Sequence, residues 1–329
     1  MINTPNALYS LLTNHQLISI AKPGARSALP AFCLALLLWG SILLPLQAQN
    51  ADLRKTVHTN IHQALRDGNA TQLNLRDQQL FGVDDSLQYL QSLTFLNLMR
   101  NNLEEWPREI FALPHLEVLN VHSNKLKNIP EEIGGFSGLL RLDAAKNQFT
   151  TVPEVIGELH ELRFLHLSLN YITHVSEEIA RCRKLEVLEL QHNQLSSVPA
   201  SLSKLKKLRE LNLGYNQFHE FDPEWLHLKK LEKLSLEFNY LRNLPEDIDQ
   251  LKGLQALILN DNKLESLPEK ITQLDELELL ILSNNRLEKL PATLEKMTSL
   301  KTLIALGNNF SKAEKERIRK ALPGCKVYL

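Results

Sequence analysis

Two histidines and one glutamate in the middle of the chain are the side chains whose types could bind a metal ion. Glu189 lies 23 residues after His166, and His192 follows three residues later. Imidazole nitrogens and carboxylate oxygens are common zinc ligands. The spacing matches no structural zinc pattern of cysteines and histidines, and solvated polar side chains are the ordinary alternative. We therefore expect neither a metal ion nor another cofactor.

The other reactive groups do not form a catalytic motif. The sequence contains no nucleophile elbow, phosphate-binding loop or zinc-protease motif. Cys182 occupies the same repeat position as Leu113 and Leu159, which predicts a small buried side chain rather than a reactive thiol. The 37 basic and 38 acidic residues nearly cancel, so the chain lacks the basic excess of a general nucleic-acid binder. The sequence predicts a protein that is not an enzyme and has no nucleic-acid partner.

The feature that positions these side chains is a leucine that recurs every 23 residues, which we call the anchor leucine. It occurs eleven times, at Leu73, Leu96, Leu119, Leu142, Leu165, Leu188, Leu211, Leu234, Leu257, Leu280 and Leu303. A chain with such a period builds one unit per repeat and stacks the units, so that each unit buries its apolar face against its neighbours. The period predicts an elongated α/β solenoid with a broad curved surface, which favours binding over catalysis.

Each unit also carries a short strand, an asparagine and, in most units, a proline. The alternation of Leu119 and Val121 predicts a strand, and successive strands should align in parallel on the concave side. The fifth residue after the anchor is asparagine in ten units and Gln78 in the first, and its amide can satisfy buried backbone groups. The eleventh residue is proline in seven units. Three other units carry Asp84, Ser176 or Asp222 there. We interpret both positions as structural.

Both ends of such a solenoid need a cap, because they would expose apolar side chains and unpaired strand edges. Residues 51–67 predict an amphipathic helix that ends at Gly68. The apolar face of this helix would comprise Leu53, Val57, Ile61 and Leu65. At the other end, Ser311 and Glu314 stand in capping-box spacing at the start of a predicted helix, and residues 325–329 predict a final strand.

The N-terminus has the composition of an export signal. The first 51 residues contain no acidic residue, carry Lys22 and Arg26, and are uncharged from residue 27 to residue 46. Cleavage after Ala48 would release a secreted or periplasmic protein. The alternative is an uncleaved membrane anchor formed by residues 27–46, because about 20 apolar residues can span a bilayer. The repeats would then be tethered outside the cytoplasm.

The repeat pattern LxxLxxLxLxxNxLxxLPxxIxx, as in LELLILSNNRLEKLPATLEKM, resembles a known family. It is similar to the short 23-residue leucine-rich repeats of plant Ras-group proteins, animal signalling scaffolds and bacterial leucine-rich repeat proteins with an export signal. The resemblance implies a horseshoe-shaped solenoid that binds a protein or peptide. No kinase, ligase or nucleotide-binding segment accompanies the repeats, so functions that relatives owe to such segments are not implied.

The chain accordingly divides into four segments. We expect an export signal or anchor at residues 1–48, an N-terminal cap at 49–72, eleven repeats at 73–310 and a C-terminal cap at 311–329.

The predicted ligand site lies on the concave face of the central repeats. Four residues after the anchor, successive units carry Leu169, His192, Tyr215 and Phe238, and exposed aromatic side chains are typical of binding hot spots. The rest of the predicted site comprises Phe164, His166, Tyr171, Glu189, Gln191, Glu237 and Tyr240. The alternative is that the aromatic ladder only strengthens the sheet. Stacked aromatic rings also suit a carbohydrate, and an anchored form would be a receptor or adhesin.

Overall fold

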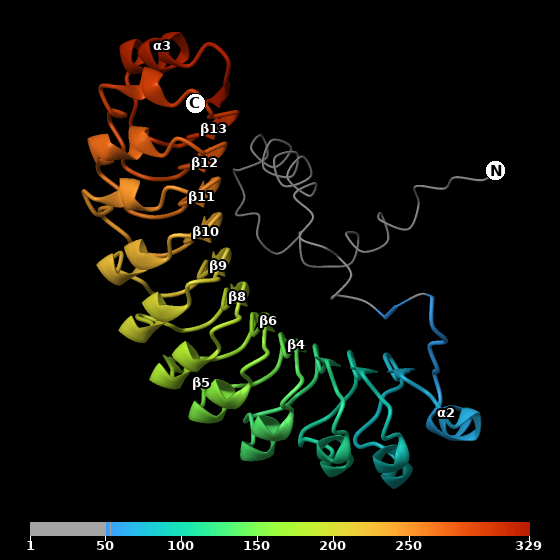
Figure 1. Ribbon diagram of the computed structural model, residues 1–329. Helices are drawn as coiled ribbons and strands as arrows, with labels where there is room; N and C mark the ends of the chain where they lie inside the picture. The colour runs from blue at the N-terminus through green and yellow to red at the C-terminus, as the bar shows by residue number, and fades with distance from the viewer. Residues whose placement is uncertain (1–50, 53) are drawn as a thin grey trace, which may run out of the picture. The chain divides into compact units, whose positions relative to one another are not determined.

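The computed structural model describes residues 51–52 and 54–329. The predictions for residues 1–48, and for Leu53, lie outside the described residues. The described part coils into eleven units, each with a three-residue strand, a turn and, in most units, a short 3-10 helix. Figure 1 shows the strands on the inner side of the arc and the short helices on its outer side. None of the described helices is long and apolar enough to cross a bilayer.

The strands form one parallel sheet of twelve strands, which confirms the predicted leucine-rich repeat solenoid. Each anchor leucine pairs with the anchor of the next unit, as Leu119 does with Leu142, so every unit advances the register by one period. The strands are β1 (Gln72–Asn74), β2 (Phe95–Asn97), β3 (Val118–Asn120), β4 (Arg141–Asp143), β6 (Phe164–His166), β8 (Val187–Glu189), β9 (Glu210–Asn212), β10 (Lys233–Ser235), β11 (Ala256–Ile258), β12 (Leu279–Ile281), β13 (Thr302–Ile304) and β14 (Lys326–Tyr328). A separate pair, β5 (Thr151–Val152) and β7 (His174–Val175), was not expected from the sequence.

The outer side is built from short 3-10 helices that pack apolar side chains against the anchors. They are η4 (Asp85–Tyr89), η5 (Arg108–Ala112), η6 (Glu131–Gly135), η7 (Glu154–Glu158), η8 (Glu177–Arg181), η9 (Ala200–Lys204), η10 (Pro223–His227), η11 (Ile248–Gln250), η12 (Glu269–Gln273) and η13 (Leu294–Lys296). Five of them begin directly after a proline. Where Asp84, Ser176 or Asp222 stands instead, its side chain accepts a hydrogen bond from the second residue after it. Proline and the polar caps therefore start the same turn in different ways.

The asparagine position has the structural role that the sequence predicts. The Nδ2 atom of Asn193 donates to the carbonyl oxygens of Leu167 and Leu190, at 3.0 and 2.9 Å. Its Oδ1 atom accepts from the backbone N–H of Ile172 at 2.9 Å. The side chain therefore joins its own unit to the preceding one. In the first unit, the side chain of Gln78 instead donates to Thr59 in the cap, at 2.9 Å.

The N-terminal cap differs from its prediction. Its helix α2 spans only Ile61–Asp67, with Asn60 as its N-cap and Gly68 in the left-handed conformation as its C-cap. The preceding residues do not continue the helix, because the backbone of His58 forms a parallel bridge to Leu73 and extends the sheet. The expected helix over residues 51–67 is therefore wrong at residues 51–52 and 54–60, although its end at Gly68 is right.

The C-terminal cap is a helix followed by a strand, as expected. The helix α3 spans Lys312–Ala321, and Ser311 caps it by accepting from the Glu314 N–H at 3.1 Å. The Glu314 carboxylate does not return to Ser311 to complete a capping box. It accepts from the Leu290 N–H at 2.9 Å and from Arg317, which ties the helix to the last repeats. The strand β14 then covers the edge of β13.

Candidate ligand-binding surface

The aromatic ladder lies beside the sheet rather than on its strands. Each strand ends one residue after the anchor, whereas the ladder position lies four residues after it, in the turn. Leu169, His192, Tyr215 and Phe238 all have a positive φ, between 51° and 57°. The placement of the ladder on the concave strands is thus corrected, because the left-handed turn carries these residues to the edge where the strands end.

Backbone hydrogen bonds hold this left-handed position in the same orientation in successive units. The N–H of His192 donates to the carbonyl of Gly214 at 3.0 Å, and that of Tyr215 donates to Glu237 at 2.7 Å. Left-handed backbone costs a non-glycine residue about 1–2 kcal/mol, so these side chains are held in place by the surrounding repeats. Their positions are therefore fixed before any ligand arrives.

Three of the ladder side chains form a continuous stack. The ring centroids of His192 and Tyr215 lie 3.9 Å apart at an interplanar angle of 18°, and those of Tyr215 and Phe238 lie 4.2 Å apart at 15°. All three residues are half-buried. Burial lowers the pKa of His192 below its ordinary value, which favours the neutral ring in the stack. We call His192, Tyr215, Phe238 and the neighbouring Tyr240 the aromatic edge.

Tyr240 extends this edge with a second stack. Its ring lies 5.0 Å from that of His219, and the Lys263 ammonium lies 4.7 Å from its centroid. Tyr240 is 41% exposed and Tyr171 is 54% exposed, which makes them two of the most exposed aromatic residues in residues 54–329. Tyr171 occupies the same repeat position as Tyr240, but three units earlier. The aromatic edge therefore does not include Tyr171.

Glu237 is the acidic residue whose charge has the largest effect on the pKa of Tyr215. A Cβ atom added to Gly214 would lie 2.5 Å from the Glu237 carboxylate, so the missing side chain at Gly214 leaves the space that this carboxylate fills. Burial raises the pKa of Glu237 to about 6. Burial, together with the negative charges of Glu237 and Asp261, raises the pKa of Tyr215 to about 12. One oxygen of Glu237 and the side-chain oxygen of Gln191 are buried without a hydrogen-bond partner in the described part of the chain.

The remaining predicted residues form a separate group on strands β6 and β8. His166 Nδ1 lies 2.7 Å from a Glu189 carboxylate oxygen, and Phe164 lies against the guanidinium groups of Arg141 and Arg163, at 5.4 and 5.7 Å. Burial alone would raise the pKa of Glu189, but the hydrogen bond and positive charge of His166 outweigh it and lower the pKa. Phe164 and His166 are buried, which corrects the expectation that they are exposed to a ligand on the concave face.

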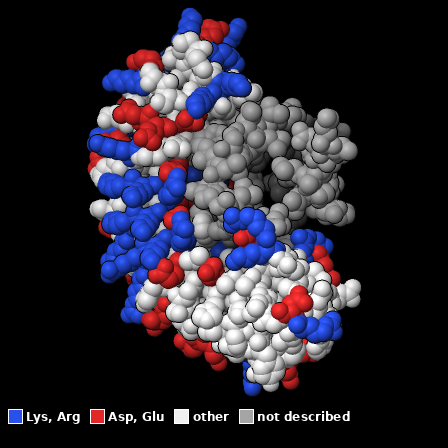
Figure 2. All heavy atoms as spheres, turned by 45° about the vertical axis from the view of Figure 1, so that its right-hand side comes forward, with Lys and Arg blue, Asp and Glu red and all other residues white. Residues whose placement is uncertain are grey.

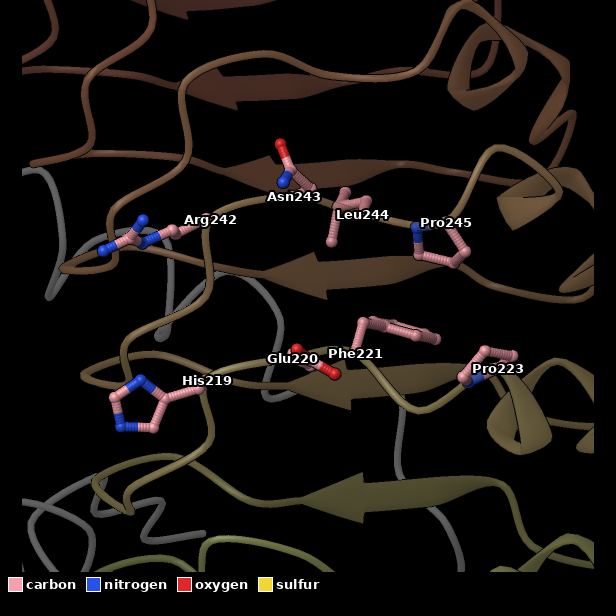
Figure 3. A pocket seen from close by; sticks show the side chains of 8 residues that line it. All are labelled: His219, Glu220, Phe221, Pro223, Arg242, Asn243, Leu244 and Pro245. Atoms are coloured by element: carbon pink, nitrogen blue, oxygen red, sulfur yellow. The ribbon is translucent and has the colours of Figure 1, made fainter.

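A cavity adjoins the aromatic edge on the outer side of the turn. It has a volume of about 530 Å³ and lies between the units that contain η10 and η11. Figure 3 shows His219 and Arg242 at one end, Phe221 and Leu244 in the middle, and Pro223 and Pro245 at the other end. Because His219 also stacks on Tyr240, the cavity opens beside the exposed part of the edge.

The Cys182 thiol and the His166–Glu189 pair each have a structural partner within the protein. The Cys182 side chain is fully buried and donates to the carbonyl of Ile156 at 3.1 Å, and burial raises its pKa to about 12. Within residues 51–52 and 54–329, no three histidine, cysteine, aspartate or glutamate side chains gather where they could hold a metal ion. His166 and Glu189 instead pair with each other.

Four residues around the site were not singled out from the sequence. Arg141 contacts Phe164, His219 and Lys263 contact Tyr240, and Gly214 makes room for Glu237. The 23-residue register aligns equivalent positions of neighbouring units, whereas His219 and Tyr240 occupy different positions of their units. Such a diagonal contact depends on the turn geometry, which the repeat pattern does not encode. Gly214 had a signal, because it is the one glycine among the eleven residues that lie three positions after an anchor leucine.

Comparisons with known proteins identify the repeats. The family model "Leucine rich repeat" matches residues 91–149, 114–172, 160–218 and 206–264. A solved leucine-rich repeat protein of Leptospira interrogans is 33% identical, with 84% of this chain and 82% of that chain covered and a TM-score of 0.63. A comparison with curated proteins gave no match.

Two further solved structures come from other kinds of protein. The ectodomain of an Arabidopsis thaliana membrane receptor kinase, in complex with Casparian strip integrity factor 2, is 34% identical, with a TM-score of 0.62. The match covers 70% of this chain but only 29% of that chain. An internalin of Listeria monocytogenes is 24% identical over 74% of this chain and 70% of that chain, with a TM-score of 0.66, and shows likeness of fold alone. Together with the match to the repeat model, the sheet register and the asparagine position show that this chain belongs to the leucine-rich repeat family.

Proposed function

We propose that this protein is a non-enzymatic module that binds a protein or peptide at the aromatic edge. The observation that carries the proposal is the stack of His192, Tyr215 and Phe238, continued by the exposed ring of Tyr240. Aromatic rings contribute large contact area with few rotatable bonds, and they are enriched at binding hot spots. The plant receptor in the comparison was solved with a bound factor, which supports a similar use of this fold.

The rigid turn gives this edge a specific advantage for binding. Side chains that are fixed by backbone hydrogen bonds and by mutual stacking lose little conformational freedom when a ligand docks. The exposed Tyr171 ring would extend the contact toward earlier repeats. The half-buried Glu189, Gln191 and Glu237 would provide polar contacts, whereas the buried His166 would act only by holding Glu189 in place. The ligand we expect therefore has an apolar side chain for the stack and polar groups beside it.

We also propose that residues 1–48 direct export and that the mature protein acts outside the cytoplasm. The support is the absence of acidic residues before Asp52, together with the uncharged run from residue 27 to residue 46. Cell fractionation with N-terminal sequencing tests this. A mature chain that starts near Gln49 supports cleavage, whereas an intact chain in the membrane fraction would show an anchored receptor or adhesin.

Crosslinking capture from the native cell envelope and medium tests binding at the aromatic edge. The site variant is Tyr215→Ala with Phe238→Ala. The matched control is Phe81→Ala with Tyr89→Ala, since these aromatic residues are 76% and 69% exposed and lie outside the edge. We expect the unmodified protein and the control to recover the same partner, and the site variant to lose it. Equal recovery by all three proteins would place the binding site elsewhere.

A further inference from the structure

The opposite side of the sheet from the aromatic edge carries a strip of positive charge. The anchor leucines of the four units concerned are Leu188, Leu211, Leu234 and Leu257, and the strip lies four and five residues before them, where the chain turns into the strands. The strip consists of six exposed residues, Arg183, Lys206, Lys207, Lys229, Lys230 and Lys252. We call it the basic edge.

The cations of the basic edge differ from the charged residues one and two positions before the anchor leucines. There, charges at equivalent positions of neighbouring units form pairs of opposite sign, as in Arg209 with Glu232 at 2.8 Å and Lys233 with Glu210 at 2.6 Å. Lys184 lies at a strip position of the first of the four units, but it pairs with Glu161 at 2.6 Å and is therefore not counted in the strip. No residue of the basic edge lies within ion-pair distance of a carboxylate in the described part of the chain. Like charges at neighbouring positions repel one another, so this arrangement does not stabilise the solenoid.

The lysines that do form hydrogen bonds leave the charge uncompensated. Lys206 donates to the carbonyls of Ser203 and His227, at 2.7 and 3.3 Å. Lys229 donates to the Gln250 side chain at 3.0 Å. These bonds to neutral oxygens hold the ammonium groups in place without neutralising them. Lys206 and Lys229 are therefore positioned charges rather than members of ion pairs.

The strip is narrow and has a definite end. In the next unit, Asp275 and Glu276 occupy the positions of Lys252 and Gly253, so the sign of the charge reverses. Figure 2 shows a group of lysine and arginine side chains along one side of the middle of the solenoid, bordered by acidic side chains above. Four units at a spacing of about 4.8 Å give a strip roughly 15 Å long.

We propose that the basic edge binds a linear anionic polysaccharide that carries sulfate or phosphate groups. Its length of roughly 15 Å suits a short stretch of one extended chain. Exposed aromatic residues, which would stack on bases, and large exposed apolar residues, which would enter a bilayer, lie elsewhere in residues 54–329. A cavity of about 340 Å³ adjoins the strip at Lys230 and is lined by Arg209, Glu232, Gly253, Gln255 and Glu276. These polar side chains suit the hydroxyl groups of a sugar ring.

Binding of the full-length protein to heparin, with dextran as the uncharged polysaccharide, tests the proposal. The site variant is Lys207→Gln, Lys230→Gln and Lys252→Gln. The control variant is Lys127→Gln, Lys289→Gln and Lys312→Gln, which removes the same charge from exposed lysines outside the strip. Because these changes are on the surface, equal melting temperatures should accompany them.

We expect the unmodified protein and the control to bind heparin but not dextran. The site variant should bind about tenfold more weakly or worse at low salt, and the slope of log K against log salt concentration should fall by roughly two to three. Equal heparin binding by site and control variants would overturn the proposal. Tighter binding to phosphatidylglycerol vesicles or to a single-stranded oligonucleotide, lost in the site variant, would overturn the assignment to a polysaccharide. Tyr215→Ala should leave heparin binding unchanged, because the two edges are independent.

Discussion

Replacing Asn193 with leucine tests whether the asparagine position joins neighbouring units. The substitution removes two donated hydrogen bonds, to Leu167 and Leu190, and one accepted from Ile172. Asn193 is only 9% exposed, so water cannot easily replace these bonds. The Leu167 and Leu190 carbonyls keep hydrogen bonds from Asn170 and Asn216, each at 3.0 Å. Of the three groups, the Ile172 N–H alone is left without a partner, and a buried unpaired group costs about 1 to 3 kcal/mol. The free energy of unfolding should fall by that amount.

Urea denaturation followed by far-ultraviolet circular dichroism measures this loss. The control is Asn243→Leu, which makes the same chemical change at an exposed site and should shift the free energy of unfolding by no more than about 0.5 kcal/mol. Hydrogen exchange should also become faster at the Ile172 amide, because that N–H loses its acceptor. An unchanged unfolding midpoint with unchanged exchange at Ile172 would refute the role assigned to this asparagine.

Three other predictions follow from single residues. Lys146 is exposed with φ 54°, so Lys146→Gly should raise the free energy of unfolding by about 0.5 to 1 kcal/mol; a loss of stability in thermal denaturation would count against the left-handed turn. Burial raises the pKa of Cys182 to about 12, so a thiol reagent at pH 8 should leave it unmodified until the protein unfolds; peptide mass mapping that finds Cys182 labelled in the native protein would disprove this. Because the folded-state pKa of Glu237 is raised to about 6, its contribution to stability is present below its ordinary value of 4.5 and is lost as pH rises through about 6. Glu237→Gln should therefore be more stable than the unmodified protein at pH 7, by up to about 2 kcal/mol, and equal to it near pH 4; parallel stability curves from pH 4 to pH 7 would show that the carboxylate is not buried.

Much of the fold could be predicted because one period determines the register. The anchor leucines fixed which residues pair, and the pairing of Leu119 with Leu142 shows the predicted spacing. The start of the N-terminal cap helix was harder to predict, since the spacing of Val57, Ile61 and Leu65 also suits a longer helix. The helix is short because His58 forms a bridge to Leu73, and this bridge is a tertiary contact. Local periodicity cannot report a pairing with a strand that lies later in the chain.

The sequence predicted which residues of the candidate site occupy equivalent repeat positions, but not the backbone conformation that orients them. The register correctly placed His192, Tyr215 and Phe238 at equivalent positions, and the structure shows them stacked. The sequence did not reveal that this position has a positive φ, because histidine, tyrosine and phenylalanine rarely adopt that conformation. The turn is imposed by hydrogen bonds between units. The same reason explains why the contact between His219 and Tyr240 was missed.

Site-specific photocrosslinking most directly tests whether the aromatic edge binds the ligand. A photoreactive amino acid is placed at Gln217, an exposed residue one unit before Tyr240 in the same repeat position, and in a second protein at Lys127, which is exposed and lies outside the edge. Both proteins are irradiated in the native envelope and medium. We predict a specific crosslinked partner from position 217 that is absent from position 127 and disappears when Tyr215 and Phe238 are replaced by alanine. A partner crosslinked equally from both positions, or from position 217 despite the alanine replacements, would contradict a binding site at the aromatic edge.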